Sequence, residues 1–151
     1  MKRAGIISMF LFIIFSLLGC STNNVILPKY VSKECHYGQG TQDYTDFCKY
    51  YYNNESIKAF EMHNKFKIVN TSDIEDIKSY FENFNDYIKN QSYCNKYDFD
   101  YKAQIKENDY FYIVSKEGDT IGDSVYGKYD SYDVYYVDME KCILYFIHVN
   151  T

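Results

Sequence analysis

The chain has 151 residues, a formal net charge of -5 and 46% hydrophobic residues, which fits one ordinary domain. Aromatic residues make up 20% of the sequence although Trp is absent, because Tyr alone contributes 19 residues. This aromatic content excludes a disordered chain, and one Pro with seven Gly excludes collagen-like and Pro/Gly-rich low-complexity proteins.

The first 19 residues have the parts of an export signal in the usual order. Lys2 and Arg3 are positively charged, residues 6–18 are almost wholly apolar, and the small Gly19 precedes Cys20. The apolar run spans about thirteen residues, whereas a helix that crosses a membrane needs about twenty. Residues 1–19 are therefore predicted to be a signal peptide and not a transmembrane anchor.

The tetrapeptide Leu17-Leu18-Gly19-Cys20 resembles the lipobox of bacterial lipoproteins. In that family a peptidase cuts before the Cys, whose sulfur receives a diacylglycerol and whose new amino group receives a fatty acid such as palmitate. The resemblance implies that Cys20 anchors the protein to a membrane in the cell envelope. It implies the periplasmic face of the outer membrane in a Gram-negative cell, and otherwise the outer face of the cell membrane. An ordinary signal peptide is the alternative.

Removal of the signal peptide makes the protein more acidic. Residues 1–19 hold Lys2 and Arg3 and no acid, so the 16 basic residues fall to 14 against 21 acidic ones, a formal charge of -7. The only Arg is lost with the signal. A nucleic-acid surface needs a basic patch, so we expect no nucleic-acid partner and consider a cationic protein partner in the envelope a better fit.

After Cys20 the sequence predicts a tether at 20–24 and one α+β domain at 25–151. Residues 25–30 are a candidate first strand, although Pro28 confines it to an edge or a loop. Residues 35–54 show no clean period and are predicted to be a disulfide-stapled loop, with a helical turn around 44–51 as an option. Residues 55–69 fit either a short helix that leads into a strand or one continuous strand.

Four cysteines remain once Cys20 is assigned to the lipid. In an oxidising envelope they are expected to form two disulfides. Of three possible pairings we favour Cys35 with Cys48, which closes a short loop, and Cys94 with Cys142. The sequence has no C-x-x-C pair and no Cys/His zinc-finger spacing, so these residues are not expected to bind a metal.

Residues 72–89 give the clearest helix signal. Ser72 and Glu75 have the spacing of a capping box, and acidic residues occupy the first turn, where the helix dipole favours them. Apolar residues then recur at helical spacing, namely Ile74, Ile77, Tyr80, Phe81, Phe84, Tyr87 and Ile88. We expect this stripe to pack on the domain's own sheet.

The C-terminal part, residues 97–149, changes to a period of two. Strands are predicted at 97–102, 109–115, 125–129, 132–138 and 142–149, joined by short connections that favour an antiparallel meander of four or five strands. The last two strands are apolar on both faces. One helix covers only one face, so the other face is expected to be covered by the N-terminal segment, a second copy or a partner.

A search for chemistry finds no catalytic constellation. His36, His63 and His148 lie in different segments without an acidic neighbour at catalytic spacing, and no nucleophile, metalloprotease, phosphate-loop or dinucleotide motif is present. We therefore predict no catalytic residue, no metal ligand and no cofactor, and favour a protein that is not an enzyme.

The remaining signal is the tyrosines, since Tyr combines large contact area with a hydroxyl that tolerates water. The candidate binding surface comprises Tyr50, Tyr51, Tyr52, Tyr132, Tyr135 and Tyr136, although the codon bias of a low-GC genome also explains abundant Tyr. The main hypothesis is a non-catalytic binding module, such as an inhibitor or immunity protein against a cationic partner. The alternative is a domain with an aromatic pocket between helix and sheet that binds a small ligand or the cell wall, either as a binding protein or as an enzyme.

Overall fold

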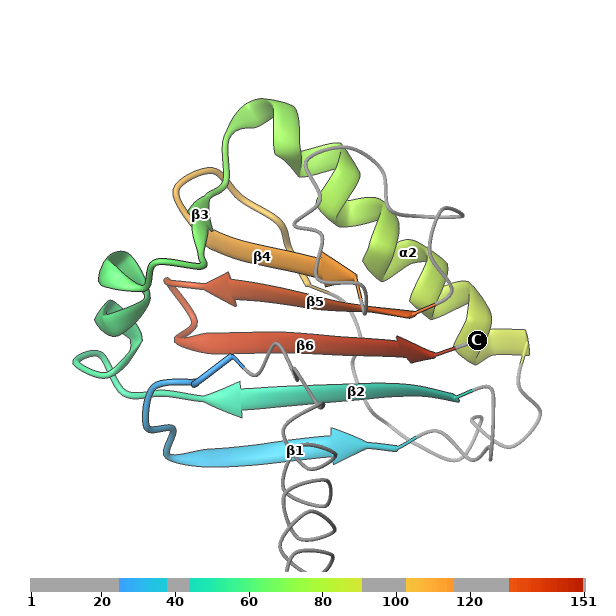
Figure 1. Cartoon of the computed structure of the whole chain (residues 1–151), viewed down its shortest axis with the longest axis horizontal. Coiled ribbons are helices and arrows are strands. Elements are labelled where there is room, and N and C mark those ends of the chain that lie inside the picture. Colours follow the sequence, from blue (N-terminus) through green and yellow to red (C-terminus); the bar gives the residue numbers. More distant parts are fainter. Residues whose placement is uncertain (1–24, 38–43, 91–102, 116–130, 151) are drawn as a thin grey trace, which may run out of the picture.

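A six-stranded antiparallel sheet and one long helix form the part of the chain that the computed structural model describes, residues 25–37, 44–90, 103–115 and 131–150 (Figure 1). The predicted α+β class is confirmed, with six strands where four or five were expected. The strands lie in the order β1-β2-β6-β5-β4-β3. In chain order the elements are β1 (Ser32–His36), β2 (Tyr44–Tyr51), the 3-10 helix η1 (Ile57–Met62), β3 (Lys67–Ile68), the 3-10 helix η2 (Thr71–Asp73), α2 (Ile74–Asn90), β4 (Tyr110–Ser115), β5 (Ser131–Asp138) and β6 (Ile143–Asn150).

Strands β4, β5 and β6 are successive antiparallel neighbours and confirm the meander in this region. Their register brings equivalent apolar residues together, since Val134 of β5 is opposite Ile113 of β4 and Ile147 of β6. The predicted strands at 97–102 and 125–129 lie outside the described residues, as do the signal peptide 1–19 and the tether 20–24.

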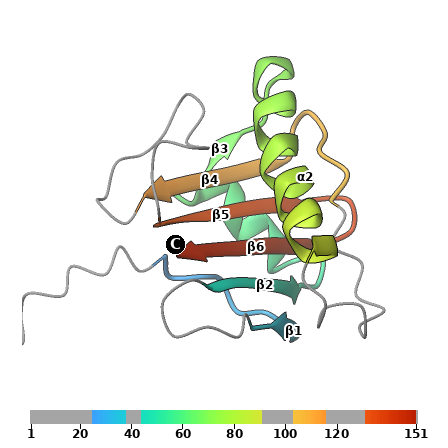
Figure 2. The same ribbon diagram turned by 90° about the vertical axis from the view of Figure 1, so that its right-hand side faces the viewer.

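Helix α2 lies across one face of the sheet (Figure 2). The apolar stripe predicted from helical spacing is buried at Ile77, Tyr80, Phe81 and Phe84. Rings of the helix contact rings of the sheet directly: the centroids of Phe47 and Phe84 are 5.2 Å apart. We call this layer the helix-side core; its buried members are Phe47, Val69, Ile77, Tyr80, Phe81, Phe84, Phe111, Ile113, Tyr132, Val134, Tyr136, Tyr145 and Ile147.

The predicted cap of this helix is wrong by two residues. The backbone N–H of Asn70 donates to Asp73 Oδ2 at 2.9 Å, so the reciprocal cap is built by Asn70 and Asp73 and not by Ser72 and Glu75. Both pairs have the same i, i+3 spacing of a small polar residue and an acid, so the sequence pattern alone did not separate them. The chain enters α2 through η2, which explains the earlier start.

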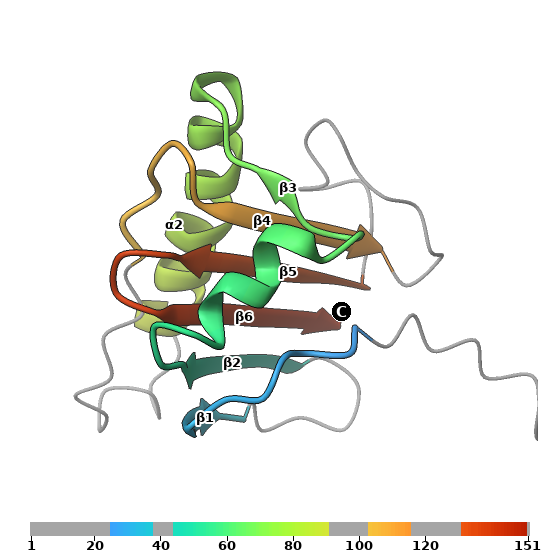
Figure 3. The same ribbon diagram turned by 90° about the vertical axis from the view of Figure 1, so that its left-hand side faces the viewer.

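The opposite face of the sheet is covered by residues 25–31 and by η1 (Figure 3). Val25 and Leu27 pack against this side, and Ile57 and Phe60 of η1 are buried in it. Of the three covers considered from the sequence, the N-terminal segment is the one present, together with η1. We call this layer the coil-side core; its buried members are Tyr52, Ile57, Phe60, Phe66, Tyr112, Val114, Tyr135, Val137 and Leu144.

Residues 35–54 are not the predicted loop with a helical turn. Ten of the fourteen residues that the structure describes in this range belong to β1 and to β2, an interior strand that pairs with β1 and β6. The period of two was hidden because β2 carries polar residues on both faces. Lys49 is buried at 8% exposure, with its Nζ 5.8 Å from the centroid of the Tyr145 ring.

The predictions for two further segments, residues 25–30 and 55–69, have different outcomes. Residues 25–30, a candidate first strand, cover the coil side without joining the sheet. Residues 55–69 follow the first of the two interpretations, a short helix that leads into a strand, because η1 is followed by β3. Asn53 Oδ1 accepts the backbone N–H of Ser56 at 2.8 Å and stabilises the turn that begins η1.

Candidate functional site

The six tyrosines predicted as one binding surface do not share a surface. Tyr51 is half-buried and donates its hydroxyl to Glu34 Oε2 at 2.9 Å, whereas Tyr50 is half-buried on the coil side. The other four are buried in the two cores and do not form a surface: Tyr132 and Tyr136 on the helix side, and Tyr52 and Tyr135 on the coil side. Alternation of side chains along each strand separates residues that are adjacent in sequence.

A smaller tyrosine group does reach solvent, at the edge where β1 pairs with β2. Tyr30 and Tyr37 are exposed, and the ring of Tyr30 lies 5.0 Å from that of Tyr50 in an edge-on arrangement. Burial raises the pKa of the Tyr50 hydroxyl, and its neighbours Tyr30 and Tyr37 add to the shift. Of the six predicted residues, Tyr50 alone belongs to this group. The sequence did not reveal it because Tyr30 and Tyr37 flank a strand that was not predicted.

The cysteines give one of the two expected disulfides. Cys35 and Cys48 face each other on β1 and β2 and are bonded, as predicted. Cys142 carries a free thiol, 3.3 Å from Asn54 Oδ1, so the expected bond to Cys94 is not formed in the structure. Cys94 lies outside the described residues. Cys142 ends the turn between β5 and β6, where its backbone adopts φ 56°, a conformation that favours Gly or Asn.

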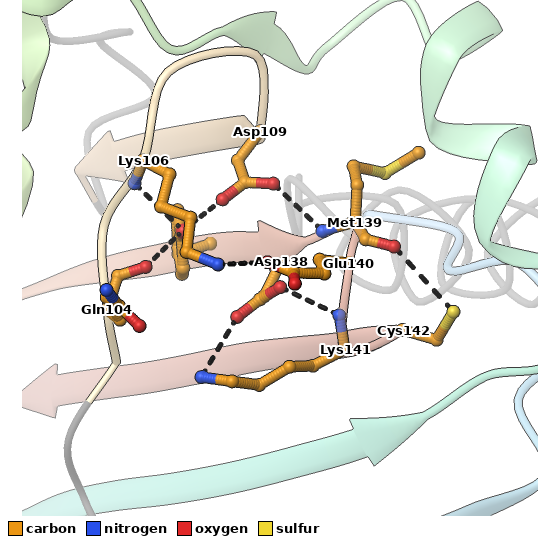
Figure 4. Close-up of polar contacts among 9 residues, drawn as sticks. Gln104, Lys106, Asp109, Asp138, Met139, Glu140, Lys141 and Cys142 are labelled. Carbon is orange, nitrogen blue, oxygen red and sulfur yellow. Dashed lines mark hydrogen bonds and ion pairs between the residues drawn. The ribbon is translucent and has the colours of Figure 1, made fainter.

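Buried polar side chains converge where this turn meets the segment before β4 (Figure 4). Asp109 accepts the backbone N–H of Met139 at 2.9 Å through Oδ1, and its Oδ2 contacts the Tyr136 hydroxyl. Asp138 is fully buried and accepts the backbone N–H of Lys141 at 2.9 Å through Oδ1. We call Asp109, Tyr136 and Asp138 the buried carboxyl cluster.

The Tyr136 hydroxyl is the centre of the hydrogen bonds in this cluster. It contacts Asp109 Oδ2 as a donor and also lies 2.9 Å from the Gln104 carbonyl, so its one hydrogen is shared between two acceptors. The backbone N–H of Lys106 donates to the phenol oxygen at 3.2 Å. Burial raises the pKa of the Asp109 carboxyl, whereas the hydrogen bonds from Tyr136 and Met139 act in the opposite direction.

The buried carboxyl cluster is almost completely shielded from solvent. Asp109 is 5% exposed, and Tyr136 and Asp138 are fully buried, so a substrate cannot reach them without opening the sheet end. Asp138 Oδ2 lies 3.3 Å from the Lys141 ammonium and has no hydrogen-bond donor among the described residues. The cluster fixes the β5–β6 turn to the segment that precedes β4.

A second polar arrangement was missed from the sequence. His148 Nδ1 lies 2.6 Å from Asp133 Oδ1, and the two residues are opposite each other on β6 and β5. Asp46 of β2 is opposite His148 on the other side. Only the strand register brings these residues together, which is why the spacing search found no acidic neighbour. In nucleophilic catalysis a carboxylate orients a histidine base, which activates a nucleophile. This pair supplies the first two groups and no nucleophile, so it does not by itself indicate catalysis.

Acidic side chains gather on the outer surface of the helix layer. Residues 71–85 contain four acids against one Lys, a net charge of -3, and Glu75, Asp76 and Glu82 are exposed. Glu107, from the segment before β4, joins them because its carboxylate accepts the hydroxyl of Thr71. Glu75 and Asp76 lie in the first turn of α2, where negative charge stabilises the helix dipole. Glu82 and Glu107 lie outside that turn, so the dipole does not explain them. We call Glu75, Asp76, Glu82 and Glu107 the acidic helix surface.

Three further findings bear on function. Among the described residues no group of three His, Cys, Asp or Glu side chains is arranged to hold a metal ion. Within the described ranges, no helix is long and apolar enough to cross a membrane. No family model matches the chain, and neither a curated protein nor a solved structure matches it.

Proposed function

We propose that this chain is an envelope lipoprotein anchored through Cys20, and that its domain is a non-catalytic binding module for a cationic protein. The binding module belongs to the inhibitor or immunity type and acts at the periplasmic face of the outer membrane in a Gram-negative cell, and otherwise at the outer face of the cell membrane. The anchor follows from Leu17-Leu18-Gly19-Cys20, and the role of the domain follows from how charge is distributed over its two layers.

The unequal charge of the two layers carries the binding proposal. The acidic helix surface combines residues that are 32 positions apart, Glu75 and Glu107, into one exposed region. Lys78 is the one cation in residues 71–85, and its ammonium lies 3.7 Å from the carboxylates of both Glu75 and Glu82. A cationic partner replaces these weak exposed ion pairs and is attracted over a longer range by the summed negative charge.

The alternative, a pocket between helix and sheet, receives less support. Aromatic rings from α2 and the strands are in contact across that space: Tyr80 and Tyr132 have ring centroids 5.6 Å apart, and those of Phe81 and Tyr136 are 6.0 Å apart. Side chains that touch one another leave the interface packed instead of open to a ligand. A small-ligand or cell-wall-binding role therefore needs a site elsewhere in the molecule.

Metabolic labelling with a fatty-acid analogue tests the anchor. We expect the wild-type chain to take up the label and the Cys20→Ser variant to take up none. Cys142→Ser is the matched control, because it also removes a thiol that carries no disulfide in the structure. Label retained by Cys20→Ser would show that this Cys is not the lipidation site.

Site-specific crosslinking in the native envelope tests the partner. A photoreactive residue at Ser72, which is exposed beside the acidic helix surface, should capture a basic protein. Neutralising the surface with Glu75→Gln and Glu82→Gln should remove most of that product, whereas Glu55→Gln and Glu61→Gln, exposed on the other layer, should leave it unchanged. An equal yield from all three proteins would contradict binding through the acidic helix surface.

A further inference from the structure

We propose that the coil-side layer of the domain rests on the lipid surface, so that the acidic helix surface faces away from the membrane. This layer consists of residues 25–31, of η1 with its flanking residues 53–66, and of the residues at β1 that share this face of the sheet. The inference rests on the lipid anchor of the proposed function and adds an orientation and a second, reversible contact with anionic lipid.

The length of the tether is the first argument. Val25 and Leu27 pack against the coil-side core, so the chain already belongs to the fold at residue 25. Five residue steps separate Cys20 from Val25, and a fully extended chain covers at most about 18 Å over that distance. A compact domain of about 127 residues has a diameter of about 35 Å. The tether therefore holds the surface around Val25 within about 18 Å of the lipid, a distance shorter than the domain is wide.

The exposed apolar side chains lie on that same layer. Ile26 is 85% exposed between two half-buried neighbours, and Met62 at the end of η1 is 87% exposed. The two segments are joined there, since His63 Nε2 lies 3.2 Å from the Ile26 carbonyl. Five of the six large hydrophobic residues that the described part exposes belong to the segment 26–37 or to η1: Ile26, Tyr30, Val31, Tyr37 and Met62. Tyr and aliphatic side chains of this kind insert at the membrane interface.

Charge favours the same orientation. Lys29 and Lys58 are exposed on the layer, and Lys33 on β1 shares its face because it is opposite Tyr50 in the sheet. Lys65, whose ammonium lies 5.8 Å from the centroid of the Tyr112 ring, adds a fourth lysine, while the acids on this face are Glu55, Glu61 and, beside His148 on the sheet, Asp46 and Asp133. Residues 25–31 and 53–66 alone carry three lysines and two glutamates, a net charge of +1, whereas residues 71–85 carry a net charge of -3. Anionic lipid therefore repels the helix layer and not the segments that hold Lys29 and Lys58.

Tryptophan quenching in vesicles tests this orientation, because the chain contains no Trp of its own. The full lipidated protein is reconstituted in phosphatidylglycerol-containing vesicles with Met62→Trp as the probe and Glu82→Trp as the matched control on α2. Both positions are exposed, so neither change disturbs a core. Lipids brominated along their chains should quench the Trp at position 62 strongly and the Trp at position 82 little or not at all.

Vesicle flotation separates the possible failures. If the protein floats with the vesicles but the probe at position 62 is quenched no more than the control, the anchor stands and the orientation is wrong. If the protein does not float, the anchor itself is wrong and the orientation fails with it. Replacing Lys29 by Gln should weaken the contact on anionic vesicles about fivefold and leave it unchanged on zwitterionic ones. If the Trp at position 62 is quenched equally on anionic and zwitterionic vesicles, with and without Lys29→Gln, then attraction between lysines and anionic lipid does not orient the domain.

Discussion

The two faces of the sheet are covered by different means, one by a single regular helix and the other by an irregular segment and a short 3-10 helix. On the helix side, α2 supplies Ile77, Tyr80, Phe81 and Phe84 at helical spacing. On the coil side, the cover is assembled from residues that are far apart in sequence, such as Leu27 and Phe60. Both layers nevertheless bury large aromatic side chains, so regular secondary structure is not a requirement for covering a sheet.

The difference between the two layers extends to their outer surfaces. The helix layer presents acids, and the coil-side layer presents lysines and exposed apolar side chains. A domain that is fixed to a membrane at one end has a near side and a far side, and the division between the two layers fits this arrangement. The following predictions compare what each layer contributes to the free energy of unfolding. They also test whether the two outer surfaces have different functions.

The largest effect is expected from truncating one aromatic ring in each core. Phe60 is fully buried, and Phe81 is 2% exposed, so Phe60→Ala and Phe81→Ala should each lower the free energy of unfolding by about 3–5 kcal/mol. Urea denaturation followed by far-UV circular dichroism measures both. A cost below about 1 kcal/mol for Phe60→Ala alone would mean that the coil-side layer is not packed as the structure shows.

Loss of the disulfide is expected to come next. The bond joins Cys35 of the edge strand β1 to Cys48 of β2 with a sequence separation of 13 residues. The double variant Cys35→Ala, Cys48→Ala should lose about 3 kcal/mol, because the unfolded chain is no longer constrained. Thermal denaturation with and without reductant checks this. If reduction leaves the melting temperature of the wild-type protein unchanged, the bond does not contribute to stability.

Asp109→Asn should cost about 1–3 kcal/mol, since the amide replaces a carboxyl that is bonded to Tyr136 and Met139. The cost should depend on pH. Burial raises the pKa of Asp109 above its ordinary 3.8, so the native state holds this proton more tightly than the unfolded state does. Its contribution is therefore fully present below pH 3.8 and is lost as pH rises through the raised pKa.

Denaturation curves of the wild type and Asp109→Asn at a series of pH values measure that dependence. The difference between their free energies of unfolding should shrink as pH rises, and the exposed control Asp76→Asn should show no such trend. A difference that grows with pH would mean that the folded protein lowers the pKa of Asp109.

The smallest effect is expected at the turn between β5 and β6. Cys142 adopts φ 56°, so Cys142→Asn should raise the free energy of unfolding by up to about 1 kcal/mol, while Cys142→Ala should give no gain. The same variant tests the disulfide that was expected from the sequence. A loss of about 2–4 kcal/mol on Cys142→Asn under oxidising conditions would show that Cys142 is bonded in the protein after all.

The parts of the fold that could be predicted from the sequence are those in which apolar residues recur at a regular spacing. Helix α2 and strands β4, β5 and β6 follow from spacings of 3.6 and 2 residues, and the bond between Cys35 and Cys48 follows from their short separation. Strand β2 was missed because Lys49 is buried on one of its faces among apolar neighbours. The cap was misplaced because Asn70 with Asp73 and Ser72 with Glu75 share one pattern.

The candidate site was harder to predict because its residues come together only through strand register. The pair of Asp133 and His148 and the contact of Asp109 with Tyr136 join positions 15 and 27 residues apart. Composition drew attention to tyrosine, but four of the six chosen residues are core residues. The exposed group at Tyr30 and Tyr37 required knowledge of β1.

Hydrogen exchange of the lipidated protein, compared between anionic vesicles and detergent micelles, tests most directly whether the domain has a membrane side and a far side. We predict slower exchange on vesicles at residues 25–31 and 57–66 and unchanged exchange at residues 74–85. Slower exchange at α2 with none at residues 25–31 would contradict the orientation on which the roles of the two layers depend.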